Sequence, residues 1–417
     1  MTAHSPPDAD SALSRRAALL SGLWVLAFFS NVPLYVGTFV FPPLQPLHWI
    51  IVLLVPTLLM LTGDERLFER PLVFPAVLAA YACVCLAWYV GQGGGDLIVL
   101  RQRMLGLIFC SVCYLVFTTS DNALLVARKA LIVVTIGSVL LNFYDISHPY
   151  VLIPSYSEFA SVGRAAGLFI NPNQAGTALV LGLVLSIRLV PPRWRVAYII
   201  FVAAGVTVTL SRSAMLSFAV ACFGLTIGTH GLLTRRQILS ALGIGATAAW
   251  ATWLVVAAEI EQRFNIDPAV AIDRVLWILD PSGRSDFSQF ERLQLLQRGL
   301  DQFLASPLWG NGVGSTELWA ERTSTHNLYV MLASDFGVLG LFVLPVIIVV
   351  AMGGIPSRVR EVTVGGLAIL IFGIFSHNIL GEFYVLISIA LLAAIARSRT
   401  SEPVESRASN QLCSVST

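Results

Sequence analysis

A histidine stands where a polar stretch of the chain meets an apolar one. Ser324-Thr325-His326-Asn327 closes the polar residues 259–325, and apolar residues follow. An imidazole titrates near neutral pH, so a histidine at such a boundary can act as a general base. The same residue can instead cap a helix or pack against polar neighbours, and position alone leaves both interpretations open. His377, inside an apolar run, is a second candidate, because ionisable groups are costly within a membrane.

The polar stretch is also rich in arginine. Its six arginines are Arg263, Arg274, Arg284, Arg292, Arg298 and Arg322. Arginine is always charged and binds phosphate through two parallel hydrogen bonds. These residues predict contacts to an anionic substrate, although a GC-rich genome would also favour arginine over lysine throughout the chain.

Arg212 lies in Thr209-Leu210-Ser211-Arg212-Ser213, which joins two apolar runs with almost no loop. A tight hairpin needs no charge at its tip, so we interpret Arg212 as a fixed positive charge facing an anionic substrate. The alternative is a side chain that extends to the lipid headgroups.

Asn171-Pro172-Asn173 opens another apolar run. A proline between asparagines predicts a capped helix start, and exposed N–H groups at a helix start can also bind an anion. Arg164 lies just before this segment, and Arg101 and Arg103 form a further pair at the head of a different run.

The composition indicates an integral membrane protein. The chain has 417 residues, 56% hydrophobic and 12% charged, against about 25% charged for a soluble domain. Apolar blocks of about 16 to 25 residues predict an all-α bundle rather than a barrel. Five of the six cysteines lie in apolar runs, which argues against a disulfide framework. We interpret the first apolar run as a retained span rather than a cleaved signal.

We predict about twelve spans and one long loop. Residues 1–258 hold nine spans, 259–325 form the loop, 326–400 hold three spans, and 401–417 are a tail. The expected spans are 17–34, 47–62, 72–90, 104–119, 124–143, 168–188, 196–210, 214–230, 238–258, 327–351, 363–380 and 383–397. Basic pairs in alternate loops predict that both termini are cytoplasmic and that the long loop lies on the opposite, non-cytoplasmic side of the membrane.

Within the loop, residues 268–279 predict a short amphipathic helix and residues 286–305 a second one. The second helix carries an apolar stripe of Phe287, Phe290, Leu293, Leu296, Leu300 and Phe303. Both are expected at the bilayer surface or capping the bundle. Gly310, Gly312 and Gly314 then predict a flexible turn.

Motifs of several enzyme classes are missing from the sequence. It has no Walker A, HExxH or GxSxG pattern, and its one DxD, Asp8 to Asp10, lies at the predicted cytoplasmic end. We therefore predict no metal site and no cofactor. Arginines that neutralise leaving phosphates would take the role that a metal ion has elsewhere.

Several segments together resemble the O-antigen ligase and O-antigen polymerase superfamily of bacterial envelopes. The resemblance covers about residues 160–345. Its motifs are Gly167…Asn171-Pro172-Asn173…Gly176, Ser211-Arg212, Arg292…Gly299…Pro307-Leu308-Trp309-Gly310-Asn311-Gly312, Thr325-His326-Asn327-Leu328-Tyr329 and Asp335-Phe336-Gly337.

The resemblance implies an inner-membrane glycosyltransferase that is inverting and metal-independent. Its donor would be a glycan on undecaprenyl pyrophosphate, and a ligase's acceptor would be a sugar hydroxyl of the lipid A-core. It implies that His326 is the base or orients the acceptor, that Arg212 and Arg292 hold the pyrophosphate, and that Asn171 and Asn173 shape the cavity. Arg284 competes with Arg292 for the loop role.

Arg164, Arg101 and Arg103 are further expected substrate contacts. The expected partners are this donor, this acceptor and membrane lipids, without nucleic acid. Length and span count favour a ligase over a polymerase. A transporter of lipid-linked glycans would spread its arginines along the bilayer depth, whereas here they gather at one face.

Overall fold

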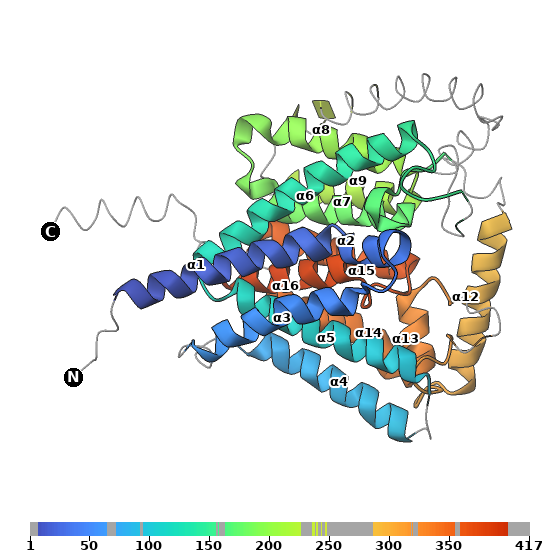
Figure 1. Ribbon diagram of the computed structural model, residues 1–417. Helices are drawn as coiled ribbons and strands as arrows, with labels where there is room; N and C mark the ends of the chain where they lie inside the picture. Colours follow the sequence, from blue (N-terminus) through green and yellow to red (C-terminus); the bar gives the residue numbers. More distant parts are fainter. Residues whose placement is uncertain are drawn as a thin grey trace, which may run out of the picture.

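The computed structural model describes residues 7–64, 72–91, 95–155, 157, 163–226, 236–237, 239–240, 243, 247, 287–317, 319, 324–354 and 359–398. Within these residues every regular element is a helix, as the composition predicts (Figure 1). The elements are α1 (Pro7–Trp24), η1 (Val25–Phe29), α2 (Val32–Tyr35), η2 (Val36–Val40), α3 (Pro46–Thr62), α4 (Val73–Gly91), α5 (Leu97–Phe117), α6 (Asp121–Ser147), η4 (Gly167–Phe169), α7 (Pro172–Ser186), η5 (Ile187–Leu189), α8 (Pro192–Val208), α9 (Arg212–Thr226), α12 (Phe287–Ala305), α13 (Leu328–Phe336), η6 (Gly337–Leu339), α14 (Gly340–Met352), α15 (Arg360–Phe375) and α16 (Phe383–Arg397).

Several of these helices can cross a bilayer. In the described part of the chain, five are long and apolar enough: Ala12–Phe29, Val73–Gly91, Leu97–Phe117, Asp121–Ser147 and Leu328–Met352. Shorter apolar helices are Pro46–Thr62, Arg212–Thr226 and Phe383–Arg397. The chain thus has the helices of a multi-pass membrane protein. The count of twelve spans stays a prediction, and the expected span 238–258 lies almost entirely outside the described residues.

Three expected spans differ from the helices in a way that the local chemistry explains. The first helix starts at Pro7, ten residues before the apolar run, and the helical path breaks at Asn31, whose φ is 63°. α5 starts at Leu97 rather than at 104, because the Asp96 carboxylate accepts hydrogen bonds from two N–H groups of its first turn. The span 327–351 is interrupted at η6, which Gly337 enters with a φ of 66°.

α7 and α16 form the centre of the bundle, since nearly all their residues are buried. α7 packs against α6, α8, α9 and α15, and α16 packs against α5, α14 and α15. Small residues permit these close approaches: Gly182 of α7 faces Thr135, and Gly205 of α8 faces Val139. Glycine at such contacts is typical of helices that associate in a membrane.

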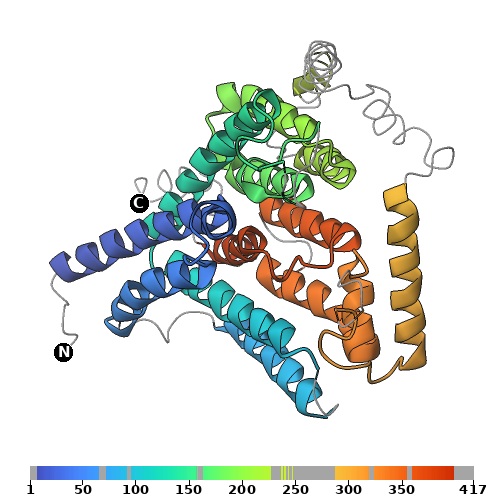
Figure 2. The same ribbon diagram turned by 45° about the vertical axis from the view of Figure 1, so that its right-hand side comes forward.

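α12 lies across the ends of the bundle helices, as an upright gold rod in both views (Figures 1 and 2). It confirms the helix predicted at 286–305, whereas the helix predicted at 268–279 lies outside the described residues. α12 packs on α13 at Gly299, where an added Cβ would meet Thr325 and Val330. Of the predicted apolar stripe, Leu293 and Leu300 are exposed on the protein, whereas Leu296 and Phe303 are half-buried.

Candidate functional site

The start of α7 gathers one group of the predicted site residues. The Asn171 side chain caps the helix by accepting a hydrogen bond from the Asn173 N–H at 2.8 Å. The Asn173 carboxamide oxygen accepts from Arg164 Nη2 at 2.9 Å, and Arg164 Nε donates to the Thr209 carbonyl at 3.1 Å. The predicted cap is therefore confirmed, and Arg164 ties it to the turn between α8 and α9.

That turn brings Arg212 to the same end of the bundle. Leu210 has a φ of 47°, and the buried Ser211 hydroxyl accepts a hydrogen bond from the Ala214 N–H at 3.4 Å. Arg212 follows as the half-buried first residue of α9. Because Gly176 leaves no room for a side chain against Ala214, the starts of α7 and α9 are held together.

His326 is fixed at the start of α13 by its neighbours on both sides. The Asn327 side chain accepts from two N–H groups of the first turn of α13, and the Thr325 hydroxyl donates to the Asn327 carbonyl at 2.8 Å. His326 itself has a φ of 53°, in the left-handed region where few non-glycine residues lie. The local fold therefore determines the backbone conformation at His326 and, with it, the position of the half-buried ring.

His377 lies beside His326, with ring centroids 5.4 Å apart and planes at 74°. The prediction that His377 lies inside a span is wrong, because α15 ends at Phe375 and places it in the turn before α16. Its Nδ1 is buried and has no hydrogen-bond partner among the described residues. Burial, with a smaller effect of His326, lowers the pKa of His377 to about 4.

A buried carboxyl group that was not predicted from the sequence, Glu382, connects the turn that holds His377 to α7. Glu382 Oε1 accepts hydrogen bonds from Gln174 Nε2 at 2.6 Å and from Asn378 Nδ2 at 3.0 Å. Burial raises the pKa of Glu382 to about 7, while these hydrogen bonds act in the opposite direction. These two hydrogen bonds join Gln174, next to Asn173 in α7, to Asn378, next to His377 in the turn before α16. An acid in the short turn between two apolar runs is the signal that would have identified Glu382.

α12 brings Arg292 close enough to influence His326. Burial, and next the positive charge of Arg292, lower the pKa of His326 below its ordinary value of 6.5. The Ser334 hydroxyl donates to the Gly299 carbonyl at 2.9 Å and fixes α12 against α13. Arg298, on the same helix, has its guanidinium 4.5 Å from the centroid of the Trp319 ring.

The three glycines of the turn after α12 are buried, whereas the flexibility expected of this turn stays a prediction. The Asn311 and Gly312 N–H groups donate to the carbonyls of Ser334 and Asp335 at 2.8 and 3.2 Å. Gly310 is buried with a φ of 68°, and an added Cβ would collide with the Asp335 carbonyl. The turn is therefore a packed part of the scaffold that carries α13.

The remaining arginines that the sequence singled out are either bound within the protein, exposed, or outside the described residues. Arg103 is buried in an ion pair with Asp335, Nη2 to Oδ2, at 2.5 Å, so it has a partner within the protein. Arg101 is exposed on α5. Arg263, Arg274, Arg284 and Arg322 lie outside the described residues. The substrate contacts expected of Arg101, Arg103 and Arg284 stay predictions, and among the described residues no three His, Cys, Asp or Glu side chains group as metal ligands.

We expect the His326 imidazole to titrate below pH 6.5, because burial and Arg292 both disfavour its protonated form. Replacing Arg292 with glutamine removes a positive charge and should raise this midpoint toward 6.5. Proton–nitrogen NMR of protein with labelled histidine measures both midpoints, with Arg298→Gln as the control on the same helix. A midpoint that Arg292→Gln leaves unchanged would contradict the electrostatic coupling.

Part of this chain is similar to a known protein family. A family model described as O-antigen ligase matches residues 197–345. No curated protein gives a significant match to the chain. The matched residues run from α8 to the first part of α14 and include Arg212, Arg292 and His326, whereas Asn171, His377 and Glu382 lie outside them. Over residues 197–345, this chain is therefore similar to the O-antigen ligases.

Proposed function

We propose that the protein is an O-antigen ligase that transfers a glycan from undecaprenyl pyrophosphate to a sugar hydroxyl of the lipid A-core on the periplasmic face. The observation that carries the proposal is the environment of His326. Its ring is half-buried, positioned by the cap of α13, and held mostly neutral near pH 7 by burial and by Arg292. A neutral imidazole at a helix start is suited to accept a proton from a hydroxyl.

The reaction balances without a covalent enzyme intermediate. The acceptor oxygen attacks the anomeric carbon of the donor while the bond from that carbon to the pyrophosphate oxygen breaks. Undecaprenyl pyrophosphate departs with the electron pair, and His326 takes the hydroxyl proton. Attack from the side opposite the leaving group inverts the anomeric configuration, and the step requires no metal ion.

The arginines would stabilise the charge that develops on the leaving group. We assign Arg212 and Arg292 to the pyrophosphate, with Arg284 as the alternative to Arg292 in the loop. Support comes from the half-buried position of Arg212 beside the Arg164–Asn173 pair and from the effect of the Arg292 charge at His326. Fixed guanidinium groups contribute most where charge appears only in the transition state.

His377 is suited to orient the acceptor. Its buried Nδ1, next to the His326 ring, has no hydrogen-bond partner among the described residues. A buried polar atom without a partner costs about 1–3 kcal/mol, and a sugar hydroxyl would remove that cost. Since burial holds this imidazole neutral, it would bind the hydroxyl while His326 takes the proton.

Reconstitution with purified donor and lipid A-core acceptor tests the proposal. We expect one glycan added per acceptor, with the same rate in the presence of a metal chelator. With donor alone, a lengthened glycan would identify a polymerase. Passage of glycan across vesicles without a new covalent bond would identify a transporter, and either outcome would overturn the ligase assignment.

Arg292→Gln should reduce kcat/KM for the donor about 10- to 100-fold, the typical loss of one charge-assisted hydrogen bond. Arg298→Gln is the matched control, because Arg298 lies six residues along the same helix and contacts Trp319. We expect little change in the control beyond a modest loss of stability. Equal losses in both variants would indicate that α12 needs its arginines only for structure.

A further inference from the structure

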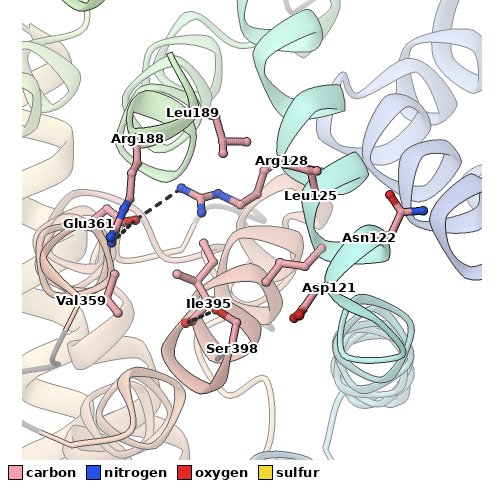
Figure 3. Close-up of a pocket in the computed structure, with 11 residues that line it drawn as sticks. Asp121, Asn122, Leu125, Arg128, Arg188, Leu189, Val359, Glu361, Ile395 and Ser398 are labelled. Carbon is pink, nitrogen blue, oxygen red and sulfur yellow. Dashed lines mark hydrogen bonds and ion pairs between the residues drawn. The ribbon is translucent and has the colours of Figure 1, made fainter. Parts of the chain in front are cut away.

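A second site lies at the end of α6 opposite the residues described above. A cavity of ≈ 470 Å³ is present there, close to Asp121 at the start of α6 (Figure 3). The Asn142 and Asp145 end of that helix contacts η4 beside the candidate site. Since α6 has 27 residues, the two ends are about 40 Å apart. Its charged lining residues are Asp121, Arg128, Arg188 and Glu361.

Two arginines of this cavity share one carboxylate oxygen. Glu361 Oε1 lies 3.4 Å from Arg128 Nη2 and 3.6 Å from Arg188 Nη1. The Glu361 and Arg128 side chains are 1% and 9% exposed, whereas that of Arg188 is 36% exposed. Figure 3 shows both guanidinium groups directed toward Glu361 from different helices. One carboxylate cannot neutralise two guanidinium groups, so this cluster has an excess positive charge beside an open cavity.

The other carboxylate of the lining does not remove that excess. Asp121 lies on a separate wall, away from the two arginines (Figure 3). It occupies the first turn of α6, where the positive end of the helix already stabilises a carboxylate. The electrostatics around Arg128 and Arg188 therefore favour an anion.

The rest of the lining restricts the chemical class of that anion. Leu124, Leu125, Leu189 and Ile395 form an apolar part of the wall. A small hydrophilic anion gains no binding energy from such an apolar surface. An amphiphile, by contrast, can place its charged group on the arginines and its acyl chain on the leucines. Arginine binds phosphate oxygens through two parallel hydrogen bonds.

We propose that this cavity binds the phosphate of a phosphate ester, with the headgroup of an anionic phospholipid as its source. Arg188, the more exposed of the two arginines, makes the main contact, and Arg128 supports it while remaining bonded to Glu361 and to the Leu185 carbonyl. The site is separate from the proposed transfer reaction and does not depend on it.

Native mass spectrometry of the full chain, delipidated in neutral detergent, tests this site. We expect dioleoyl phosphatidylglycerol to bind more tightly than dioleoyl phosphatidylcholine. Arg188→Gln should weaken phosphatidylglycerol binding about fivefold, the typical effect of one basic residue at an anionic lipid. Arg193→Gln, an exposed arginine at the start of α8 outside the lining, is the matched control and should bind as the wild type does. Equal affinity for the two lipids, or equal losses in both variants, would overturn the proposal.

A second pair of variants tests the cavity while keeping every charge. Leu125→Trp fills the space and should abolish the phosphatidylglycerol preference, whereas Leu140→Trp, on an exposed position of the same helix, should retain it. Adding inorganic phosphate distinguishes the two sources of the anion. Displacement of the lipid only at high phosphate concentration supports a lipid headgroup. Saturable binding of phosphate alone, at the same sites and without any lipid preference, would reject it.

Discussion

Glycan transfer should fall about 10²- to 10⁴-fold when His326 is replaced, the usual contribution of a general base. We propose two substitutions because His326 has a φ of 53°. Alanine removes the ring but is strained in the left-handed region, whereas asparagine tolerates that region and supplies no base. His326→Asn therefore separates loss of chemistry from loss of backbone conformation. Product formation from radiolabelled donor in the reconstituted assay measures the effect.

The control for His326 is His148→Ala. His148 is an exposed histidine at the C-cap of α6, where it stacks on Tyr144. We expect unchanged transfer in this variant and normal folding in all three. If His326→Asn keeps near-normal turnover, His326 does not take the proton. Activity retained by His326→Gln but not by His326→Asn would instead mean that the side chain only orients the acceptor.

Asp335→Ala should be the most destabilising single substitution that we propose. Asp335 accepts hydrogen bonds from Arg103 and from both the N–H and the hydroxyl of Ser315, at 2.9 and 2.8 Å for the serine. Without the carboxylate, the Arg103 guanidinium is a buried charge without its ion-pair partner. Breaking such a pair costs about 3–5 kcal/mol. A thermal unfolding curve of the purified protein in detergent shows this as a large fall in Tm.

Asp301→Ala serves as the comparison, since Asp301 is exposed on α12. The double variant Arg103→Met with Asp335→Leu should recover much of the loss, because apolar residues of similar volume often replace a buried ion pair without cost. If Asp335→Ala melts at the temperature of Asp301→Ala, the ion pair does not hold α5, α13 and the glycine-rich turn together.

The sequence was sufficient to predict the helical class, most helix positions and the Asn171 cap. The bilayer explains this, because a span must be a continuous apolar helix whose polar groups are satisfied internally. The cap of α5 by Asp96 was missed because Arg101 and Arg103 interrupt the apolar pattern, so the span was expected to begin only at 104. α12 was predictable from its periodicity, but its close contact at Gly299 was not, because a glycine adds nothing to an apolar pattern.

The polar contacts of the site were less accessible from sequence. Gln174 and Glu382 are 208 residues apart, and Arg103 and Asp335 are 232 apart. No local pattern links such residues, since their distance depends on how the spans pack. His326 and Arg212 could be selected because a charge at a span boundary is itself unusual. Glu382 and Asn378 were not selected, and although an acid in a short turn between apolar runs marks Glu382 as a candidate, no local pattern shows that it is buried against Gln174 and Asn378.

Gly299 is a point of close approach between α12 and α13, so it fixes the position of the helix. An added Cβ there would collide with the side chains of Thr325 and Val330, so a larger residue requires either these side chains or α12 to move. Arg292 lies seven residues from Gly299 on the same helix, about 10 Å away along its axis. A small tilt of α12 therefore moves the Arg292 charge relative to His326. The packing of Gly299 thus sets the position of Arg292 relative to His326. Relatives of this chain with a larger residue at this position would need compensating changes at Thr325 or Val330 to keep that alignment.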